Sequence, residues 1–548
     1  MKTQSKSRLV GANAPGIIAP IGQCRIGFQP LPTFAPGHIG IVAKSGTLSY
    51  ETVASITRSG LGQSLCIGMG GDIIAGTSLV DALKVFEADP ETEGIILVGE
   101  VGGRAEEDAA AWIRDYRKRV AKPKPIAALV GGLNAPPGRI MGHAGAWAAR
   151  GERSAKEKYS VLQDAGATMV DHPENFGGVM KTLLSQSGRD PQQIMRDAAN
   201  QRRGYHTMRT RPTIQQRSRL AEQQQQSRNL LLSPHAASGP LEQYLEGVDG
   251  LSLVRESQPE DAFFVGITVD RSERSPCIAT SPTASPEQLD QRVRRFPYDW
   301  QEGPSDVGIK QAIEHMQLDA APPAAMAQVS CLIQTLARMY REKEAVTLSG
   351  SVSVGGDGNL RVHLPSLVMQ FDDAAFKSGK RQEDIHSLRV KEAEDAEEVE
   401  AEKDGIVFVK LDDPEANIGT LVNGAGLAMN TVDALRLHGG KATNFLDTGG
   451  KATSETVKKS FELILKDPRV KVIFVNIFGG LTDGGMIAEG VLLAFKEVDM
   501  KNKPVVVRIR GTNEEKGQKI IAESGLSLEA FDGFAEAAKR VVEIANSR

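Results

Sequence analysis

IGIVAKSGTLSYETV (residues 39–53) and IGTLVNGAGLAMNTV (residues 418–432) are two versions of one pattern, far apart in the same chain. In each version an apolar run of the strand type leads into a glycine-containing turn and then into a helix-type segment. The correspondence continues in the same order, since GIILVGEVGG (94–103) parallels KVIFVNIFGG (471–480). A match of this length predicts a duplicated domain.

The strands and helices expected within each copy predict the fold class. Short apolar runs such as IILV (95–98) and VIFV (472–475) are typical of parallel strands buried on both faces. Amphipathic segments follow at 105–118 and 453–466, where we expect helices. The sequence therefore predicts an α/β protein with two duplicated doubly wound, flavodoxin-like domains. Ligands of such domains bind at the carboxyl ends of the strands.

Composition excludes several function classes. A chain of 548 residues is too long for one hydrophobic core, so several domains are expected. The net charge of −4 argues against nucleic acid as a partner, and no apolar run reaches the ~18–20 residues of a membrane span. The four cysteines are scattered and fit neither a zinc site nor a disulfide framework. The first residues lack an apolar signal segment, so we expect a cytoplasmic location.

The middle of the chain differs from both copies. Residues 196–249 are predicted to be a linker, because much of this stretch is rich in arginine, glutamine and serine. A third folded unit is expected over 250–390, with two strands and one helix. These elements are predicted at 262–269, 361–369 and 324–342. The acidic run 392–402 predicts a solvated helix face or a hinge.

Two glycine-containing turns each open a predicted helix, Ser45-Gly46-Thr47 in the first copy and Gly424-Ala425-Gly426 in the second. The N-terminus of a helix has free N–H groups and the positive end of the helix dipole, so it attracts anions. Two such turns in related domains predict a charged group, such as a phosphorylated histidine, held between facing helix ends. The alternative is that the glycines serve only tight turns.

A histidine between glycines is the candidate for that group. GRIMGHAGAWA (138–148) places His143 among small residues, which leave the imidazole uncovered and let the backbone approach a ligand. On this pattern alone, an ordinary loop histidine remains the alternative.

Several long motifs carry a family resemblance. Residues 8–190, with RLVGANAPGIIAP, GEVGGRAEED and MGHAGA, resemble the C-terminal part of the α subunit of succinyl-CoA synthetase. Residues 250–548, with NFLDTGG and VVVRIRGTNEEKG, resemble its β subunit. ATP-citrate lyase is related to both through the same modules. The chain is therefore similar to a truncated α subunit fused to a truncated β subunit.

The resemblance implies a domain order, in which the two CoA-ligase domains flank a degenerate half of an ATP-grasp domain. The expected domains are a remnant of a CoA-binding domain (1–37), an α-type CoA-ligase domain with the histidine loop (38–195), the linker (196–249), a partial ATP-grasp-like domain (250–390) and a β-type CoA-ligase domain (391–548).

The resemblance also implies a ligase that passes a phosphoryl group through a histidine to a carboxylic acid, after which the thiol of CoA displaces phosphate. The phosphorylated histidine would be His143 and its acidic partner Glu100, which fixes the imidazole tautomer. Substrate contacts are implied for Tyr50, Asn423, Gly480, Leu481 and Thr482. The phosphoryl group would lie at Ser45, Gly46 and Thr47 and at Gly424, Ala425 and Gly426.

The sequence departs from the family at the nucleotide and substrate sites. No counterpart of the glycine-rich CoA-binding domain or of the adenine-binding half is found. Ser349 and Ser351 stand where the family has a glutamate and the asparagine that binds magnesium, and neutral serines are poor Mg²⁺ ligands. Asp483 replaces an arginine of the carboxylate loop, and Lys451 replaces a glycine. We therefore predict no metal site, impaired use of ATP with magnesium and a substrate other than succinate.

Three functions remain open at this point. The first is an enzyme of the acid–thiol ligase family that acts on a small carboxylic acid or acyl-CoA, either with changed chemistry or with the missing parts supplied by a separate subunit. The second is a non-catalytic paralogue that binds or regulates a synthetase subunit. The third is a chain joined artificially from two truncated subunits. CoA or acyl-CoA is the expected ligand of the first.

Overall fold

The computed structural model describes residues 7–206, 229–246, 248–318, 321–377, 379–449, 452–480, 482–526 and 528–547. The chain forms two compact units. One contains Met1–Ala148, Arg153–Gln226 and Asp395–Arg548, and the other contains Ala149–Glu152 and Ser227–Glu394. Both copies of the repeat belong to the first unit, so their contacts with each other lie within one compact body.

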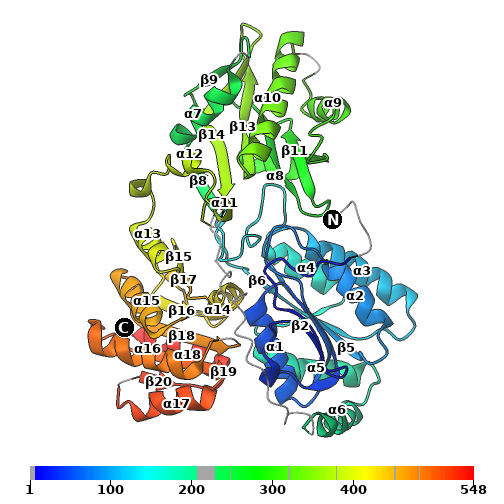
Figure 1. The fold of residues 1–548 in the computed structure, drawn as a ribbon, viewed down its shortest axis with the longest axis vertical. Helices are drawn as coiled ribbons and strands as arrows, with labels where there is room; N and C mark the ends of the chain where they lie inside the picture. The colour runs from blue at the N-terminus through cyan, green and yellow to red at the C-terminus, as the bar shows by residue number, and fades with distance from the viewer. Residues whose placement is uncertain are drawn as a thin grey trace. The chain divides into compact units, whose positions relative to one another are not determined.

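The N-terminal domain of the first unit is a twisted sheet covered by helices on both faces (Figure 1). Its strands have the order β2-β1-β4-β3-β5-β6-β7, and the pairs from β4 to β7 are parallel. They are β1 (Gly16–Ala19), β2 (Cys24–Gly27), β3 (Pro36–Ala43), β4 (Gln63–Gly68), β5 (Gly94–Glu100), β6 (Ile126–Gly131) and β7 (Thr168–Met169).

Its helices cover the sheet from two sides. In Figure 1, α2, α3 and α4 lie on one face, and α1 and α5 lie on the other. The helices are α1 (Gly46–Arg58), α2 (Leu79–Ala88), α3 (Ala105–Arg119), α4 (Ala155–Asp164), α5 (Phe176–Gln186) and α6 (Pro191–His206). Serine side chains begin several of them: Ser78 and Ser154 each form a capping box with an acidic residue three positions later.

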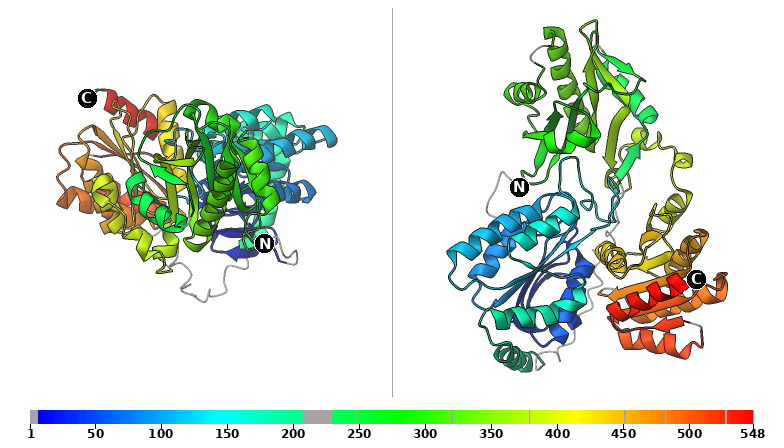
Figure 2. Two further views of the ribbon diagram at one scale, coloured as in Figure 1. Left: turned by 90° about the horizontal axis from the view of Figure 1, so that it is seen from above. Right: turned by 180° about the vertical axis from the view of Figure 1, so that it is seen from behind.

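The C-terminal domain repeats this architecture with strand order β15-β17-β16-β18-β19-β20. Its strands are β15 (Val407–Lys410), β16 (Ile418–Val422), β17 (Asn444–Asp447), β18 (Val472–Gly479), β19 (Val505–Gly511) and β20 (Leu528–Ala530). Its helices are α13 (Ala396–Lys403), α14 (Ala425–Leu437), α15 (Ser454–Lys466), α16 (Gly484–Glu497), α17 (Glu514–Glu523) and α18 (Phe534–Ser547). The view from behind in Figure 2 shows α18, in red, lying across this sheet.

The two domains share one topology, which confirms the predicted fold class. Counting from β3 and from β16, both parallel sheets have the order 2-1-3-4-5, as in flavodoxin-like folds. The likeness extends beyond the repeat seen in the sequence, because β1 pairs antiparallel with β4 as β15 pairs antiparallel with β17. Strands β1 and β2, within the interval predicted as a remnant of a separate domain, thus extend the first sheet.

A common core joins the two domains. The core cluster of the N-terminal domain also includes residues of β15, α14, β17 and β18, among them Leu427, Met429, Phe445 and Phe478. Asp433 on α14 binds the turn after β6, where its carboxylate accepts the N–H groups of Gly132 (2.7 Å), Leu133 (2.9 Å) and Asn134 (2.8 Å). Helix α14 is therefore packed against both domains.

The ionisation of Asp433 should make stability depend on pH. Burial raises the pKa of this carboxyl to about 6, although the N–H donors lower it. The unfolded chain holds the same proton with a pKa of about 3.9. Because the folded state binds the proton more tightly, stability falls as pH rises from about 4 to about 6.

We expect the wild-type protein to lose about 2 to 3 kcal/mol of unfolding free energy between pH 4 and pH 7, relative to Asp433→Asn. Urea unfolding of both proteins at several pH values measures the difference. Parallel pH profiles for the two proteins would contradict the assignment.

The second unit is an antiparallel sheet with the order β12-β11-β10-β13-β14-β8, and β9 also pairs with β14. Its strands are β8 (Asn229–Leu232), β9 (Ser252–Val254), β10 (Phe263–Asp270), β11 (Ser275–Ser281), β12 (Arg294–Pro297), β13 (Ala345–Val354) and β14 (Leu360–Asp372). Its helices are α7 (Pro234–Leu245), α8 (Pro286–Arg292), α9 (Asp306–His315), α10 (Pro323–Glu342), α11 (Asp373–Lys377) and α12 (Glu383–His386).

Part of the interval predicted as a linker is folded. Helix α6 continues to His206, and β8 and α7 occupy 229–245. The apolar run Leu230–Leu232 forms β8, which pairs with β14. Leu241 and Leu245 of α7 are buried in the core of this unit. The sequence predicts a linker here because polar residues greatly outnumber these apolar ones in the interval. Residues 207–228 lie outside the described part of the chain.

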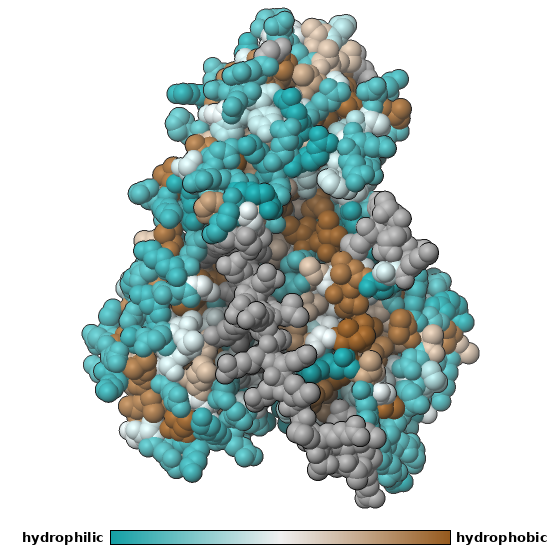
Figure 3. Space-filling model, in the orientation of Figure 1, coloured by the Kyte–Doolittle hydropathy of each residue, from teal (hydrophilic) through white to brown (hydrophobic). Residues whose placement is uncertain are grey.

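The visible surface is mostly hydrophilic, and apolar side chains show on it in scattered groups (Figure 3). No helix in the described parts of the chain has the length and apolar character needed to cross a membrane.

Candidate functional site

His143 and Glu100 form a hydrogen-bonded pair at the carboxyl end of the first sheet. Glu100 is the last residue of β5, and His143 lies in the loop that follows β6. The Nδ1 atom of His143 is 2.8 Å from Oε2 of Glu100. The Glu100 side chain is 2% exposed and that of His143 is 14% exposed. A carboxylate in this position holds the ring hydrogen on Nδ1 and leaves the lone pair on Nε2.

The histidine is more enclosed than its small neighbours suggested. A Cβ atom at Gly71 would lie 2.4 Å from both Cγ and Nδ1 of His143, so the imidazole packs directly on the backbone there. Gly142 is similarly close to the C-terminal domain, because a Cβ atom on it would lie 2.5 Å from Cβ of Ala425. The glycines around His143 therefore permit close packing between the loop and its neighbours, and they do not leave the ring uncovered.

Nearby carboxylates favour the charged form of His143. Burial lowers the pKa of His143 and is the largest single effect, but Glu100, Asp447 and Asp72 together raise it by more. The net pKa lies above its ordinary value. The imidazolium form consequently persists to a higher pH than in a free histidine, and the nucleophilic neutral form becomes dominant only above that pH.

The two helix-opening turns face each other. A Cβ atom at Gly424 would lie 2.0 Å from Oγ1 of Thr47, and one at Gly426 would lie 2.0 Å from Oγ of Ser45. Only glycine allows α1 and α14 to approach this closely at their N-termini. Ser45 caps α1 by accepting the N–H of Leu48, whereas Gly424 has no side chain to cap α14. The positive ends of two helix dipoles thus meet beside the histidine loop.

Asp447 provides a negative charge at the uncapped helix. Its Oδ1 atom accepts the N–H groups of Gly424 and, at 2.7 Å, of Gly449. Burial raises the pKa of this carboxyl to about 6, against the lowering effect of its N–H donors and of His143. The carboxylate therefore lies among the same N–H groups that an anion at this helix end would use.

The predicted substrate residues lie together but are already occupied. Asn423 donates to the carbonyl of Phe478 (3.0 Å) and to Oγ1 of Thr482 (3.1 Å), and its Oδ1 accepts the N–H of Phe478 (2.9 Å). A Cβ atom at Gly480 would lie 2.1 Å from Cδ2 of Tyr50, so this glycine packs on the tyrosine ring. Leu481 and Lys451 lie outside the described residues.

Asp483, at the position where the sequence lost an arginine, begins helix α16. Its Oδ1 atom accepts the N–H of Met486 at 3.1 Å, and its other oxygen accepts the amide of Asn513. The side chain is therefore engaged as an N-cap, for which aspartate is well suited. Its carboxylate places a negative charge in the loop where the resemblance implies substrate contacts.

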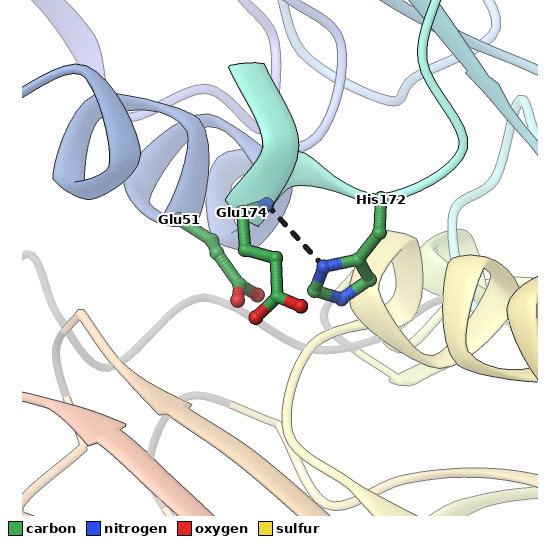
Figure 4. A group of neighbouring side chains, drawn as sticks. All are labelled: Glu51, His172 and Glu174. Carbon is green, nitrogen blue, oxygen red and sulfur yellow. Dashed lines mark hydrogen bonds between the residues drawn. The ribbon is translucent and has the colours of Figure 1, made fainter. Parts of the chain in front are cut away.

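A buried cluster between the two domains joins residues that the sequence did not single out. Figure 4 shows Glu51, His172 and Glu174, whose ligand-type atoms all lie within 4.8 Å of one another. Arg508 forms an ion pair with Glu51 and lies 3.4 Å from Glu174. Glu174 also accepts the N–H groups of Phe534 (2.7 Å) and Ala535 (3.0 Å) at the start of α18.

The donor set of this cluster suits an ion pair better than a metal. Nδ1 of His172 accepts the N–H of Glu174 at 3.3 Å, so the hydrogen of the neutral ring is on Nε2. Burial, followed by the charge of Arg508, holds the pKa of His172 well below its ordinary value. The guanidinium of Arg508 balances one of the two carboxylate charges and Glu174 also accepts two N–H groups of α18, and we infer that the cluster holds the two domains together.

Ser351, at a position where the resemblance implies a magnesium ligand, and the nearby Ser353 are hydrogen-bonded within the second unit. Ser351 donates to the side chain of Gln258, and Oγ of Ser353 is 2.9 Å from Nε2 of His363. His363 in turn has Nδ1 3.2 Å from the carbonyl of Glu256. Neutral hydroxyl groups with these partners do not fit the charged oxygen ligands that Mg²⁺ requires.

Comparison with known proteins assigns the class of the two similar domains. The family model described as CoA-ligase matches residues 42–168 and 421–542. These intervals cover the parallel sheets of both domains of the first unit. The chain therefore contains two CoA-ligase domains, one on each side of the second unit in the sequence.

The particular relatives are subunits of succinate–CoA ligase, which confirms the resemblance found in the sequence. The chain is 48% identical over 182 residues to the mitochondrial subunit alpha-2 of the ADP-forming enzyme of Trichomonas vaginalis. It is 42% identical over 183 residues to the subunit alpha of Staphylococcus epidermidis strain RP62A. Each match covers 33% of this chain. The chain spans only 58% and 59% of the lengths of these relatives.

A solved structure of ATP citrate lyase from Methanothrix soehngenii, in complex with citrate and coenzyme A, is also similar. It is 20% identical, with a TM-score of 0.38, over 53% of this chain and 74% of that chain.

Proposed function

We propose that the two CoA-ligase domains carry out acid–thiol ligase chemistry through a phosphoryl group on Nε2 of His143. The observation that carries this proposal is the His143–Glu100 pair, which lies in a loop packed against the first turn of α14, where α14 meets α1. The proposal assigns the histidine to an α-type domain of residues 38–195 and the facing helix to a β-type domain of residues 391–548. The substrates would be a small carboxylic acid and CoA, or the acyl-CoA that they form.

The arrangement supports a balanced phosphoryl transfer. With its hydrogen on Nδ1, His143 can attack the phosphorus of an acyl phosphate through Nε2. The P–O bond to the acyl group breaks, the carboxylate leaves and a P–N bond forms. The N–H groups at Ser45–Thr47 and Gly424–Gly426, of which that of Gly424 is bound by Asp447 in this structure, would stabilise the added negative charge. In the companion step, the thiolate of CoA attacks the acyl carbon of the acyl phosphate and releases phosphate.

The acid is proposed to differ from succinate. The negative charge of Asp483 would repel a second carboxylate in the substrate loop. The side-chain amide of Asn423 already donates to the carbonyl of Phe478 and to Oγ1 of Thr482, and Gly480 packs on the ring of Tyr50. These contacts leave less room and fewer free donors for a dicarboxylic acid.

Use of ATP with magnesium is proposed to be impaired. Ser349 and Ser351 bring no charged oxygen to the positions where the resemblance implies metal ligands, and the hydroxyl of Ser351 is bound to Gln258. The phosphoryl group would then come from inorganic phosphate by way of an acyl-CoA. In that sequence phosphate displaces CoA thiolate from the acyl group, and the resulting acyl phosphate reacts with His143.

Labelling with radioactive phosphate tests this proposal. The full-length protein is incubated either with ATP and magnesium or with inorganic phosphate and a panel of acyl-CoA thioesters. We expect acid-labile label from at least one acyl-CoA with phosphate, and none in His143→Ala. Label from ATP would overturn the proposed loss of nucleotide use. No label from any donor would overturn the phosphohistidine itself.

The second candidate is a non-catalytic protein that binds or regulates a synthetase subunit. Gly480 and the ring of Tyr50 are in direct contact and leave no space between them. This favours the non-catalytic function, because a catalytic site would need that space for substrate. It predicts no label, together with saturable binding to an α or β subunit of succinate–CoA ligase in sedimentation experiments.

A further inference from the structure

Three charged side chains are buried next to Glu100, at the end of strand β5. Glu106 on α3 and Lys158 on α4 have fully buried side chains, and the side chain of Lys44, at the end of β3, is 9% exposed. Oε1 of Glu106 is 2.8 Å from Nζ of Lys44, and Oε2 is 2.6 Å from Nζ of Lys158. We call these three residues the Lys–Glu–Lys triad.

The triad holds the main chain on both sides of the Glu100 side chain. Oε1 of Glu106 accepts the N–H of Glu100 at 3.1 Å. Nζ of Lys158 donates to the carbonyl of Glu100 at 3.2 Å and to that of Gly102 at 2.6 Å. Nζ of Lys44 donates to the same carbonyl of Gly102 at 3.3 Å. Both backbone groups of Glu100 are therefore bound by members of one buried cluster.

The duplicated domain shows that the fold itself does not require the triad. Lys44 directly precedes the N-cap of α1, and the residue before the N-cap of α14 is Asn423. Glu106 is the second residue of α3, and the second residue of α16 is Gly485. Lys158 is four residues after the N-cap of α4, and the residue at that place in α17 is Gly517. The same topology thus forms without any of the three charges.

Burial of these charges is costly, which argues for a specific use. Burial raises the pKa of Glu106, but the charges of Lys158 and Lys44 lower it by a larger amount. The net pKa is about 2. Burial also lowers the pKa of Lys158, and Glu106 opposes that effect. Two ammonium groups face one carboxylate, and an excess buried charge is unfavourable unless it is fully hydrogen-bonded. Here the ammonium groups of Lys158 and Lys44 also donate hydrogen bonds to the carbonyls of Glu100 and Gly102.

We propose that Lys44, Glu106 and Lys158 are positioning residues that keep the carboxylate of Glu100 on Nδ1 of His143. The bonds of their side chains go to one another and to the backbone of Glu100 and Gly102. They act through the backbone of Glu100, whose side chain sets the ring tautomer and orientation. The role of the pair in catalysis rests on the proposed function, but the positioning itself does not depend on it.

The pKa of His143 in Lys158→Met separates positioning from simple electrostatics. Removal of a positive charge by itself would raise the pKa of a nearby histidine. Loss of the bond from Glu100 would lower it, because burial would then dominate. Histidine labelled with ¹³C at Cε1 allows the titration to be followed by NMR in the full-length protein. The signal of His143 is assigned by its loss in His143→Ala.

We expect a downward shift of about one pKa unit in Lys158→Met. An upward shift or an unchanged pKa would overturn the proposal. Lys124→Met is the matched control, because Nζ of Lys124 also donates to three carbonyls, those of Phe86, Glu87 and Asp89. Lys124 lies at the opposite end of the sheet, before β6, so its loss should not move the pKa of His143.

Lys44→Asn is the second variant, in case Lys158→Met does not fold. It introduces the residue found at the same place in the C-terminal domain and leaves the Glu106–Lys158 ion pair intact. We expect the same direction of shift, and an upward shift or none in this variant would also overturn the proposal. Phosphate labelling of His143 should fall at least tenfold in both Lys158→Met and Lys44→Asn. If the wild-type protein takes no label, the proposed function fails while the NMR titration still tests the positioning.

Discussion

Replacement of Glu100 by glutamine is expected to lower the rate of phosphoryl transfer to His143 by about 100-fold or more. Glutamine has nearly the same shape, but its amide no longer attracts the Nδ1 hydrogen as a carboxylate does. The ring can then adopt the other tautomer, which places its hydrogen on Nε2 and removes the nucleophilic lone pair. The initial rate of ³²P incorporation from an acyl-CoA with phosphate measures this effect.

The same variant should change the pH profile in a defined direction. Among the carboxylates that raise the pKa of His143 against the effect of burial, Glu100 contributes most. Without its charge the pKa should fall, so any remaining labelling should reach its plateau at a lower pH than in the wild-type protein. Glu87→Gln is a suitable control, because it removes a carboxylate of the same domain that pairs with Arg119 near the surface. A wild-type rate in Glu100→Gln would show that the pair does not control the nucleophile.

Replacement of Arg508 by methionine is expected to destabilise the first unit by about 3 to 5 kcal/mol. Arg508 is 1% exposed and its partner Glu51 is fully buried, so the substitution leaves a carboxylate without its counter-ion. The ion pair joins α1 of one CoA-ligase domain to β19 of the other, and Arg508 also donates to Asn476 at 3.0 Å. Chemical denaturation followed by circular dichroism measures the loss.

A compensating variant separates the unpaired charge from the loss of packing. Removal of both partners in Glu51→Leu/Arg508→Met eliminates the uncompensated carboxylate and should recover most of the lost stability. The single variant Glu51→Leu should be destabilised as well, since it removes the nearer carboxylate and leaves Glu174, 3.4 Å away, as the counter-ion of the guanidinium. A loss of less than about 1 kcal/mol in Arg508→Met would mean that water reaches this cluster and screens the pair.

The fold followed from the sequence because its signals are local and occur twice. The run IILV forms the buried strand β5, and VIFV lies in β18. The predicted helix over 105–118 is α3, and that over 453–466 is α15, whose N-cap is Thr453. Strand burial and helix periodicity depend on neighbouring residues, so a pattern of this kind can be read directly. Strand β8 and helix α7 were not predicted, because the sequence around them is rich in polar residues.

The His143–Glu100 pair was accessible from the sequence only through the family resemblance. Nothing in the spacing of GEVGG and MGHAGA requires their side chains to meet. Their meeting follows from the parallel pairing of β5 with β6, which brings the ends of both strands to one edge of the sheet. The first helix-opening turn, Ser45–Thr47, follows β3 at the same edge, and the second turn faces it from the C-terminal domain.

The sequence by itself therefore determined the duplicated α/β architecture and the helix-opening turns. The tertiary structure alone decided which charges became partners: Lys44 and Lys158 with Glu106, Arg508 with Glu51, and Asp433 with the turn after β6. The physical reason is that hydrophobic periodicity is repeated along many residues, whereas each ion pair depends on one contact between distant segments. Such a contact exists only after distant segments have packed together, within one domain for the triad and between the two domains for Arg508 and Asp433.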